Sequence, residues 1–115
     1  MASTALSVRI LPEPLRTLAF GSITGSYVAV GTPLAHPARI VLFQNTTDVP
    51  LTISWDGVND HMYLVSDSFI LLDVGTNKGI SSEFCIAQNT QFYVAYPGSA
   101  PSTGEVVISI FYGKE

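Results

Sequence analysis

Hydrophobic and polar side chains alternate with a period of two residues along most of this chain. The segment LTISW (51–55) places leucine, isoleucine and tryptophan on one face and threonine and serine on the other. The segment VVISIFY (106–112) is apolar on both faces, as in a strand that is covered on both sides. No window of about eleven residues carries the stripe of an amphipathic helix. This pattern predicts a chain made of β-strands.

Clusters of glycine, proline, asparagine and aspartate separate the apolar segments at intervals of about 8 to 12 residues, which is typical of all-β sandwiches and barrels. The candidate strands are residues 6–11, 15–20, 26–30, 38–45, 51–55, 62–65, 69–74, 84–87, 91–96 and 106–112. We expect these ten segments to yield about nine strands of ordinary length, which predict an all-β fold, a two-sheet antiparallel sandwich of the jelly-roll type.

The length of 115 residues fits one domain, residues 1–115, and no linker or repeat divides it. Residues 1–14 end in the sequence LPEP, and we expect them to form an extended N-terminal arm or an edge strand. The candidate interface consists of the apolar side chains of this arm, Leu6, Val8, Ile10 and Leu11. The arm either closes an edge of the domain's own sheet or adds a strand to a neighbouring subunit.

Charged residues make up only 12% of the chain, compared with about 25% in an average soluble domain. Hydrophobic residues make up 47%, and the mean hydropathy is +0.36. We therefore expect copies of the chain, or another protein, to cover part of the surface. A neutral surface of serine, threonine, asparagine and glutamine is the alternative.

The charge distribution argues against nucleic acid as a partner, because the five basic residues are scattered and the net charge is −4. No apolar run approaches the ~20 residues that cross a bilayer, and the N-terminus lacks the pattern of a signal peptide. We therefore expect no membrane partner. Cys85 is the only cysteine, so no disulfide can form within the chain, and its apolar neighbours predict a buried thiol.

The segment SWDGVNDH is the strongest candidate for a binding site. Its side chains Asp56, Asn59 and Asp60 carry oxygens that calcium prefers, but they are fewer than the roughly six to eight ligands that calcium takes. His61 has no second histidine nearby to help it hold a transition metal. The pattern favours a turn in which Gly57 takes a positive φ and the short polar side chains bond to loop amides. Weak ligand binding by the three oxygen-bearing residues is the alternative, and we expect no metal site.

No other pattern predicts chemistry. A glycosidase requires two carboxyl groups that face one another. No pattern in the sequence brings two of the acidic residues at strand ends together. The chain has no G-x-S-x-G elbow, and its glycine-rich stretches lack the lysine and the helix of a phosphate-binding loop. We therefore expect neither catalysis nor a cofactor.

Two stretches resemble a known class of proteins. They are RIVLFQNTTDVPLTISWDGVNDHMYLVSDSFILLDV (39–74) and TQFYVAYPGSAPSTGEVVISIFYG (90–113). The pattern of strands and turns in them resembles that of small structural proteins of tailed bacteriophages. Those proteins tend to carry a strand ending in QN-T, a strand ending in S-DG, an acidic loop and an LDV-like strand. The resemblance covers about residues 38–113, and the residues before it contain no matching motif.

The resemblance implies a jelly-roll decoration (cement) protein, made in the host cytoplasm, that binds the outside of the capsid and staples neighbouring capsomers. Its partners would be the major capsid protein and copies of itself, and this class brings no catalytic residues. A host-glycan-binding module of a phage tail or fibre is the alternative, because β-sandwiches often present tryptophan and tyrosine to sugar rings. Trp55, however, alternates with apolar residues, so we expect it to face the core.

Overall fold

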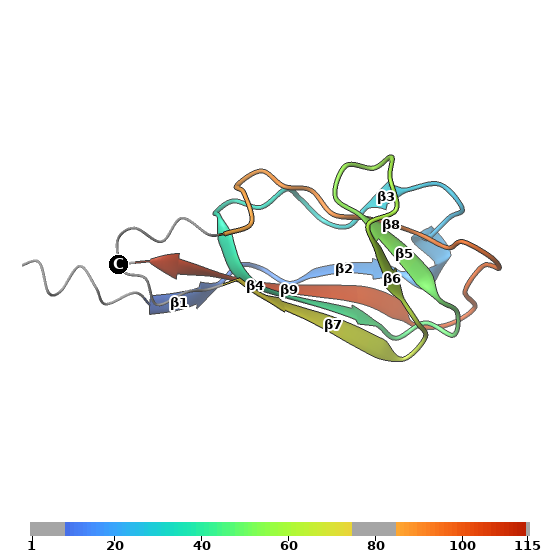
Figure 1. Ribbon diagram of the computed structural model, residues 1–115. Helices are drawn as coiled ribbons and strands as arrows, with labels where there is room; N and C mark the ends of the chain where they lie inside the picture. The colour runs from blue at the N-terminus through green and yellow to red at the C-terminus, as the bar shows by residue number, and fades with distance from the viewer. Residues whose placement is uncertain (1–8, 75–84, 115) are drawn as a thin grey trace, which may run out of the picture.

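The computed structural model, which describes residues 9–74 and 85–114, consists of two antiparallel sheets packed face to face (Figure 1). The five-stranded sheet contains β1 (Arg9–Pro12), β2 (Arg16–Ala19), β4 (Ala38–Asn45), β7 (Ser68–Asp73) and β9 (Glu105–Lys114). The four-stranded sheet contains β3 (Val28–Ala29), β5 (Leu51–Ser54), β6 (Met62–Leu64) and β8 (Tyr93–Ala95). A short 3-10 helix, η2 (Phe20–Ser22), follows β2. The predicted all-β sandwich is confirmed.

The strands pair as a nested series, β2 with β9, β3 with β8, β4 with β7 and β5 with β6. A long antiparallel ribbon gives this nesting when it is rolled so that alternate pairs fall in opposite sheets, which is the topology of a jelly roll. The strand order is β1–β9–β4–β7 in the five-stranded sheet and β3–β8–β5–β6 in the four-stranded sheet. β2 also pairs with β9, along a different part of that strand from β1. None of the described residues forms a helix with the length and apolar character needed to span a bilayer.

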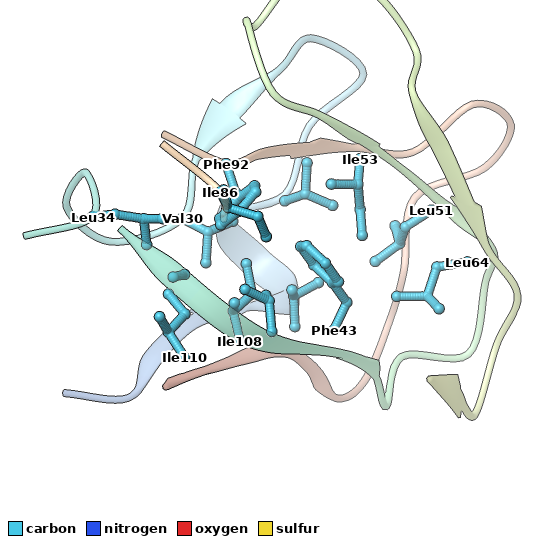
Figure 2. Packing of buried hydrophobic residues seen from close by; sticks show 14 of the residues in the cluster. Val30, Leu34, Phe43, Leu51, Ile53, Leu64, Ile86, Phe92, Ile108 and Ile110 are labelled. Carbon is cyan, nitrogen blue, oxygen red and sulfur yellow. The ribbon is translucent and has the colours of Figure 1, made fainter. Parts of the chain in front are cut away.

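The core lies between the sheets. Side chains along each strand point alternately to the two faces of its sheet, and the apolar face of each sheet points inward. Phe43 of β4 is buried opposite Ile108 of β9, and its ring meets that of Phe92 edge to face with centroids 5.0 Å apart. Figure 2 shows Phe43 between Ile108 of the five-stranded sheet and Ile53 of the four-stranded sheet. Burying one such side chain contributes roughly 1.5 to 3 kcal/mol. The inward faces are therefore the main source of stability.

The N-terminal segment forms one edge of the five-stranded sheet. β1 pairs with the C-terminal part of β9, and β2 pairs with its N-terminal part. The described part of the arm thus closes an edge of the domain's own sheet. Of the predicted interface residues, Ile10 is exposed on β1 and Leu11 is half-buried there, whereas Leu6 and Val8 lie outside the described residues.

Two details of the sequence prediction were wrong, and both concern the segment around Cys85. The expected strand at residues 84–87 is reduced, in its described part, to a single bridge between Ile86 and Ala38. The thiol of Cys85 is exposed instead of buried. In an extended chain successive side chains point in opposite directions, and the buried Ile86 takes the inward position. Cys85 therefore points outward.

Candidate functional site

The loop between β5 and β6 contains the predicted turn, and Asp56 organises it. One carboxylate oxygen of Asp56 accepts hydrogen bonds from the backbone N–H groups of Val58 (2.8 Å) and Asn59 (2.9 Å) and from the Ser54 hydroxyl (2.8 Å). The other oxygen accepts one from the Asn59 side-chain amide at 2.9 Å. Gly57 has a φ of +79°, as the turn requires.

These hydrogen bonds also set the charge state of the loop. The backbone N–H groups of Asn59 and Val58, followed by the Asn59 amide and the Ser54 hydroxyl, hold the pKa of Asp56 far below its ordinary value. Asp56 is therefore a firmly ionised carboxylate whose lone pairs are engaged by its own loop. A ligand would have to displace these bonds.

Asp60 points to another partner, whereas His61 stays close to Asp56: its Nε2 atom is 3.9 Å from the second carboxylate oxygen of Asp56. Asp60 accepts a hydrogen bond from the hydroxyl of Tyr27. Burial and this hydrogen bond together raise the pKa of Tyr27. The Nδ1 atom of His61 accepts a hydrogen bond from the backbone N–H of Trp55 at 2.9 Å. The structure thus joins two of the candidate ligand residues, Asp56 and Asn59, and turns the third, Asp60, toward Tyr27. Within residues 9–74 and 85–114, no three histidine, cysteine, aspartate or glutamate side chains gather as a metal site would need.

A groove of about 520 Å³ opens beside this loop, between the two sheets at the edge formed by β6 and β7. Its lining residues are Trp55, His61, Met62, Tyr63, Ile70 and Leu72. The expectation that Trp55 faces the core is met in part. Its ring packs edge to face on Phe92 with centroids 5.3 Å apart, while the half-buried indole also lines the groove. Its indole N–H points to the sulfur of Met62 at 3.4 Å.

The outward side of the five-stranded sheet is also apolar. The register places Leu42 opposite Leu71, and Ile40 opposite Phe111, with their side chains pointing away from the core. We call this surface the outer apolar face and define it as Ile40, Leu42, Phe69, Leu71, Val107 and Phe111. Phe69 is 62% exposed and Leu71 is 54% exposed. The other sheet covers only the opposite side (Figure 1).

Uncharged polar residues fill the remaining central positions of this face. Gln44 lies opposite Phe69 and Val107, and Ser109 lies opposite Leu42. Charged side chains at outward positions of β4, β7 and β9 occur at strand ends, as with Asp73 and Glu105. The low charge content of the sequence therefore appears here as a sheet surface without charge at its centre.

A buried charged cluster at the opposite edge was not predicted from the sequence. The Arg16 guanidinium donates to a carboxylate oxygen of Glu13 at 2.9 Å, and the Glu13 side chain is only 1% exposed. Arg16 also donates to the backbone carbonyls of Thr32 and Pro33. The second oxygen of Glu13 accepts from the backbone N–H of His36 and lies 2.8 Å from its ring Nδ1. The cluster thus ties the gap between β1 and β2 to the loop before β4.

The hydrogen bonds of this cluster favour the ionised form of Glu13. Burial by itself raises the pKa of Glu13, but hydrogen bonds from His36, Ala35 and Arg16 outweigh burial and lower the pKa below its ordinary value. The ring of His36 in turn stacks on Tyr112 of β9, with centroids 3.7 Å apart. In the sequence, the only sign of this cluster is an acid between two prolines with an arginine three residues later. No local pattern indicates His36.

In comparisons with known proteins, no family model and no curated protein matches this chain.

Proposed function

We propose that this protein is a structural component of a tailed-phage virion, a decoration (cement) protein that binds the outside of the capsid and bridges capsomers. The observation that carries the proposal is the outer apolar face, on which Phe69 and Leu71 stand more than half exposed in a regular sheet. A surface of this kind is expected to be covered by protein in the working assembly. The resemblance of residues 38–113 to small phage structural proteins supports the same role.

The physical properties of this face suit repeated, non-catalytic binding. Each square ångström of apolar surface that leaves water contributes about 25 cal/mol. Few charges would have to lose their water on binding, because charged residues make up only 12% of the chain. The rigid sandwich keeps the face in one shape, and many weak contacts across a lattice act together. The major capsid protein and further copies of the chain are the proposed partners.

The proposal assigns no catalysis and no cofactor to the described residues. The best-placed carboxylates already stabilise loops of the fold: Asp56 caps the turn after β5, Glu13 holds Arg16, and Asp48 accepts hydrogen bonds from Ser102. A general base would need a free lone pair directed into a cavity. The lone pairs of these carboxylates accept hydrogen bonds from backbone amides, a guanidinium and a hydroxyl.

A second candidate function, host-glycan binding at a tail or fibre, is favoured by the groove beside β6. Trp55 and Tyr63 are among its lining residues, and Tyr63 is 56% exposed. Aromatic side chains at an apolar groove can stack on sugar rings. Polar groups that would orient a sugar are few among the lining residues, so this function takes second place.

Co-sedimentation with phage shells that lack the protein tests the first function. We expect the wild-type chain to pellet with shells, and to raise the temperature at which they release their contents. Val107→Lys, which puts a charge in the centre of the outer apolar face, should weaken shell binding by at least about tenfold. Val58→Lys is the matched control, because Val58 is 78% exposed on the loop after β5 and lies off the sheet.

Shell binding that is equal for the two variants would contradict the role of the face, and no binding by the wild-type chain would contradict the function. Saturable binding on a glycan array that Tyr63→Ala removes would establish the second candidate instead.

A further inference from the structure

The two edges of the five-stranded sheet differ in their protection against pairing with another strand. At the β1–β2 edge, Pro12 and Pro14 have no backbone N–H to donate, and the Glu13–Arg16 pair interrupts the strand. β7 forms the other edge and runs unbroken over Ser68–Asp73. Its six-residue register with β4 has no bulge. β7 contains no proline and no lysine or arginine, which are the residues that usually guard an edge.

The side chains around β7 are apolar and exposed. Between Met62 and Leu72 the only charged residue is Asp67, in the turn between β6 and β7. Four large side chains of this segment are more than half exposed: Tyr63, Val65, Phe69 and Leu71. A free strand edge flanked by apolar side chains is a template for a further strand. This description covers only the described part of the chain.

From this asymmetry we infer that β7 is a self-association edge. β7 of a second copy pairs with it in antiparallel orientation about a twofold axis, and the two five-stranded sheets join into one continuous sheet. The inference deepens the proposed virion role and rests on it for its biological setting, because bridging capsomers requires copies to associate. One unguarded edge is enough for a twofold contact, since both copies use the same surface. A head-to-tail chain would have to use the guarded β1–β2 edge as well.

The geometry of an antiparallel seam fits the side chains of β7. Residues directly opposite one another across a seam lie on the same face of the sheet. In a twofold seam, Phe69 and Leu71 would therefore meet Phe69 or Leu71 of the partner subunit on the outer side. Ile70 and Leu72 would face their counterparts on the groove side. The outer apolar faces of both copies then lie on the same side, as binding to one shell surface requires.

The area that such a seam would bury is small, so we expect a weak contact. An aromatic side chain presents roughly 150 to 250 Å², so the exposed part of Phe69 offers on the order of 120 Å² in each copy. With Leu71 and the strand backbone, the total over two copies stays below the roughly 1,200 Å² of a standard interface. We therefore expect a weak dimer, which a lattice would strengthen.

Sedimentation velocity of the full chain over a range of concentrations tests the inference without shells. We expect the mass to rise with concentration from 12.3 kDa to twice that value. Leu71→Lys brings like charges together across the seam and should raise the dissociation constant by at least about tenfold. Leu15→Lys is the matched control, because Leu15 is 61% exposed at the guarded edge, and it should dimerise like the wild type. Thermal melts of both variants show that they fold.

Hydrogen exchange distinguishes strand pairing from stacking of the outer faces. Strand pairing predicts that amides of β7 become protected as the concentration rises, and that Val107→Lys still dimerises. A wild-type chain that stays monomeric at every concentration overturns the inference. So does a dimer that Leu15→Lys or Val107→Lys dissolves while Leu71→Lys leaves it intact.

The shell-binding assay allows the inference and the proposed function to fail independently. A monomer that pellets with shells would contradict the inference and support the proposed function. A β7-dependent dimer that does not bind shells would support the inference and contradict the proposed function.

Discussion

Gly104, directly before β9, occupies a position that has no room for a side chain. Its φ is +88°, and a Cβ atom there would lie 2.2 Å from the backbone oxygen of Thr46. The backbone of Thr46 is held in turn by a hydrogen bond from its N–H to the carbonyl of Glu105 at 3.0 Å. The contact therefore has little freedom to relax.

We predict that Gly104→Ala lowers the free energy of unfolding by about 3 kcal/mol, because both the dihedral strain and the clash with fixed backbone must be accommodated. Urea unfolding measures the change. Gly98→Ala is the control, since nothing lies within 4 Å of the added Cβ atom at Gly98, and its stability should change by less than about 0.5 kcal/mol. Equal effects of the two substitutions would contradict this account.

Asp56 and Glu13 show when the role of a single residue could be predicted from the sequence and when it could not. The partners of Asp56, from Ser54 to Asn59, lie within three positions of it, so the turn was predicted from local chemistry. Glu13 contacts His36, which lies 23 positions along the chain. The pairing of β1, β2 and β4 with β9 brings these two side chains together, and no local pattern encodes that pairing.

At the scale of elements, the Glu13–Arg16 pair holds the interrupted β1–β2 edge in place. We predict that Glu13→Gln destabilises the protein by about 3 kcal/mol, because it leaves the buried Arg16 guanidinium without its counter-charge. Glu105→Gln removes the same charge from an exposed position at the start of β9 and should change stability by less than about 0.5 kcal/mol.

Urea unfolding compares these two variants, and hydrogen exchange locates the effect. We expect the loss of protection in Glu13→Gln to concentrate in β1 and β2. Equal stability of the two variants would show that the pair contributes nothing measurable.

The strands themselves were largely predictable, because burial on one or both faces leaves a period of two in the sequence. Residues 38–45, for example, form β4 within the predicted bounds. The error at 84–87 has a physical reason. An apolar run such as this indicates burial but does not specify the neighbouring strand, and in its described part the backbone forms one β-bridge, between Ile86 and Ala38. The groove beside β6 was not predicted, because its walls come from both sheets.

At the scale of the whole molecule, stability depends on acidity, because three carboxylates in the described part of the chain have lowered pKa values. The pKa values of Glu13, Asp48 and Asp56 all lie below their ordinary values, which are 4.5 for glutamate and 3.8 for aspartate. A carboxyl whose pKa is lower in the folded state contributes its full stabilisation above the unfolded pKa. It loses that stabilisation as the pH falls toward the folded pKa.

We therefore predict that the free energy of unfolding falls steadily as the pH drops below about 4.5. Urea titrations at a series of pH values measure this slope. Glu13→Gln should show a shallower slope, because one of the three groups no longer titrates. Stability that is constant down to about pH 3 would contradict the prediction.

The fold class was predictable from the sequence, but the strand pairing was not. The alternation of apolar and polar residues and the spacing of turns predict a two-sheet sandwich, yet they do not specify that β2 pairs with β9. The low charge content predicts that protein covers part of the surface, and this stays a prediction. Only the register of β4, β7 and β9 shows that apolar side chains gather on the outward side of one sheet.

The nesting of the strand pairs has a consequence for synthesis on the ribosome. β5 and β6, the innermost pair, are close in sequence and can meet as soon as both have emerged, whereas β1, β2 and β4 all pair with residues 105–114. Closing the outer pairs links segments far apart in the chain, which is entropically costly and slow. The nascent polypeptide must therefore carry unpaired apolar strands until residues 105–114 leave the exit tunnel, and it is prone to aggregation during that time.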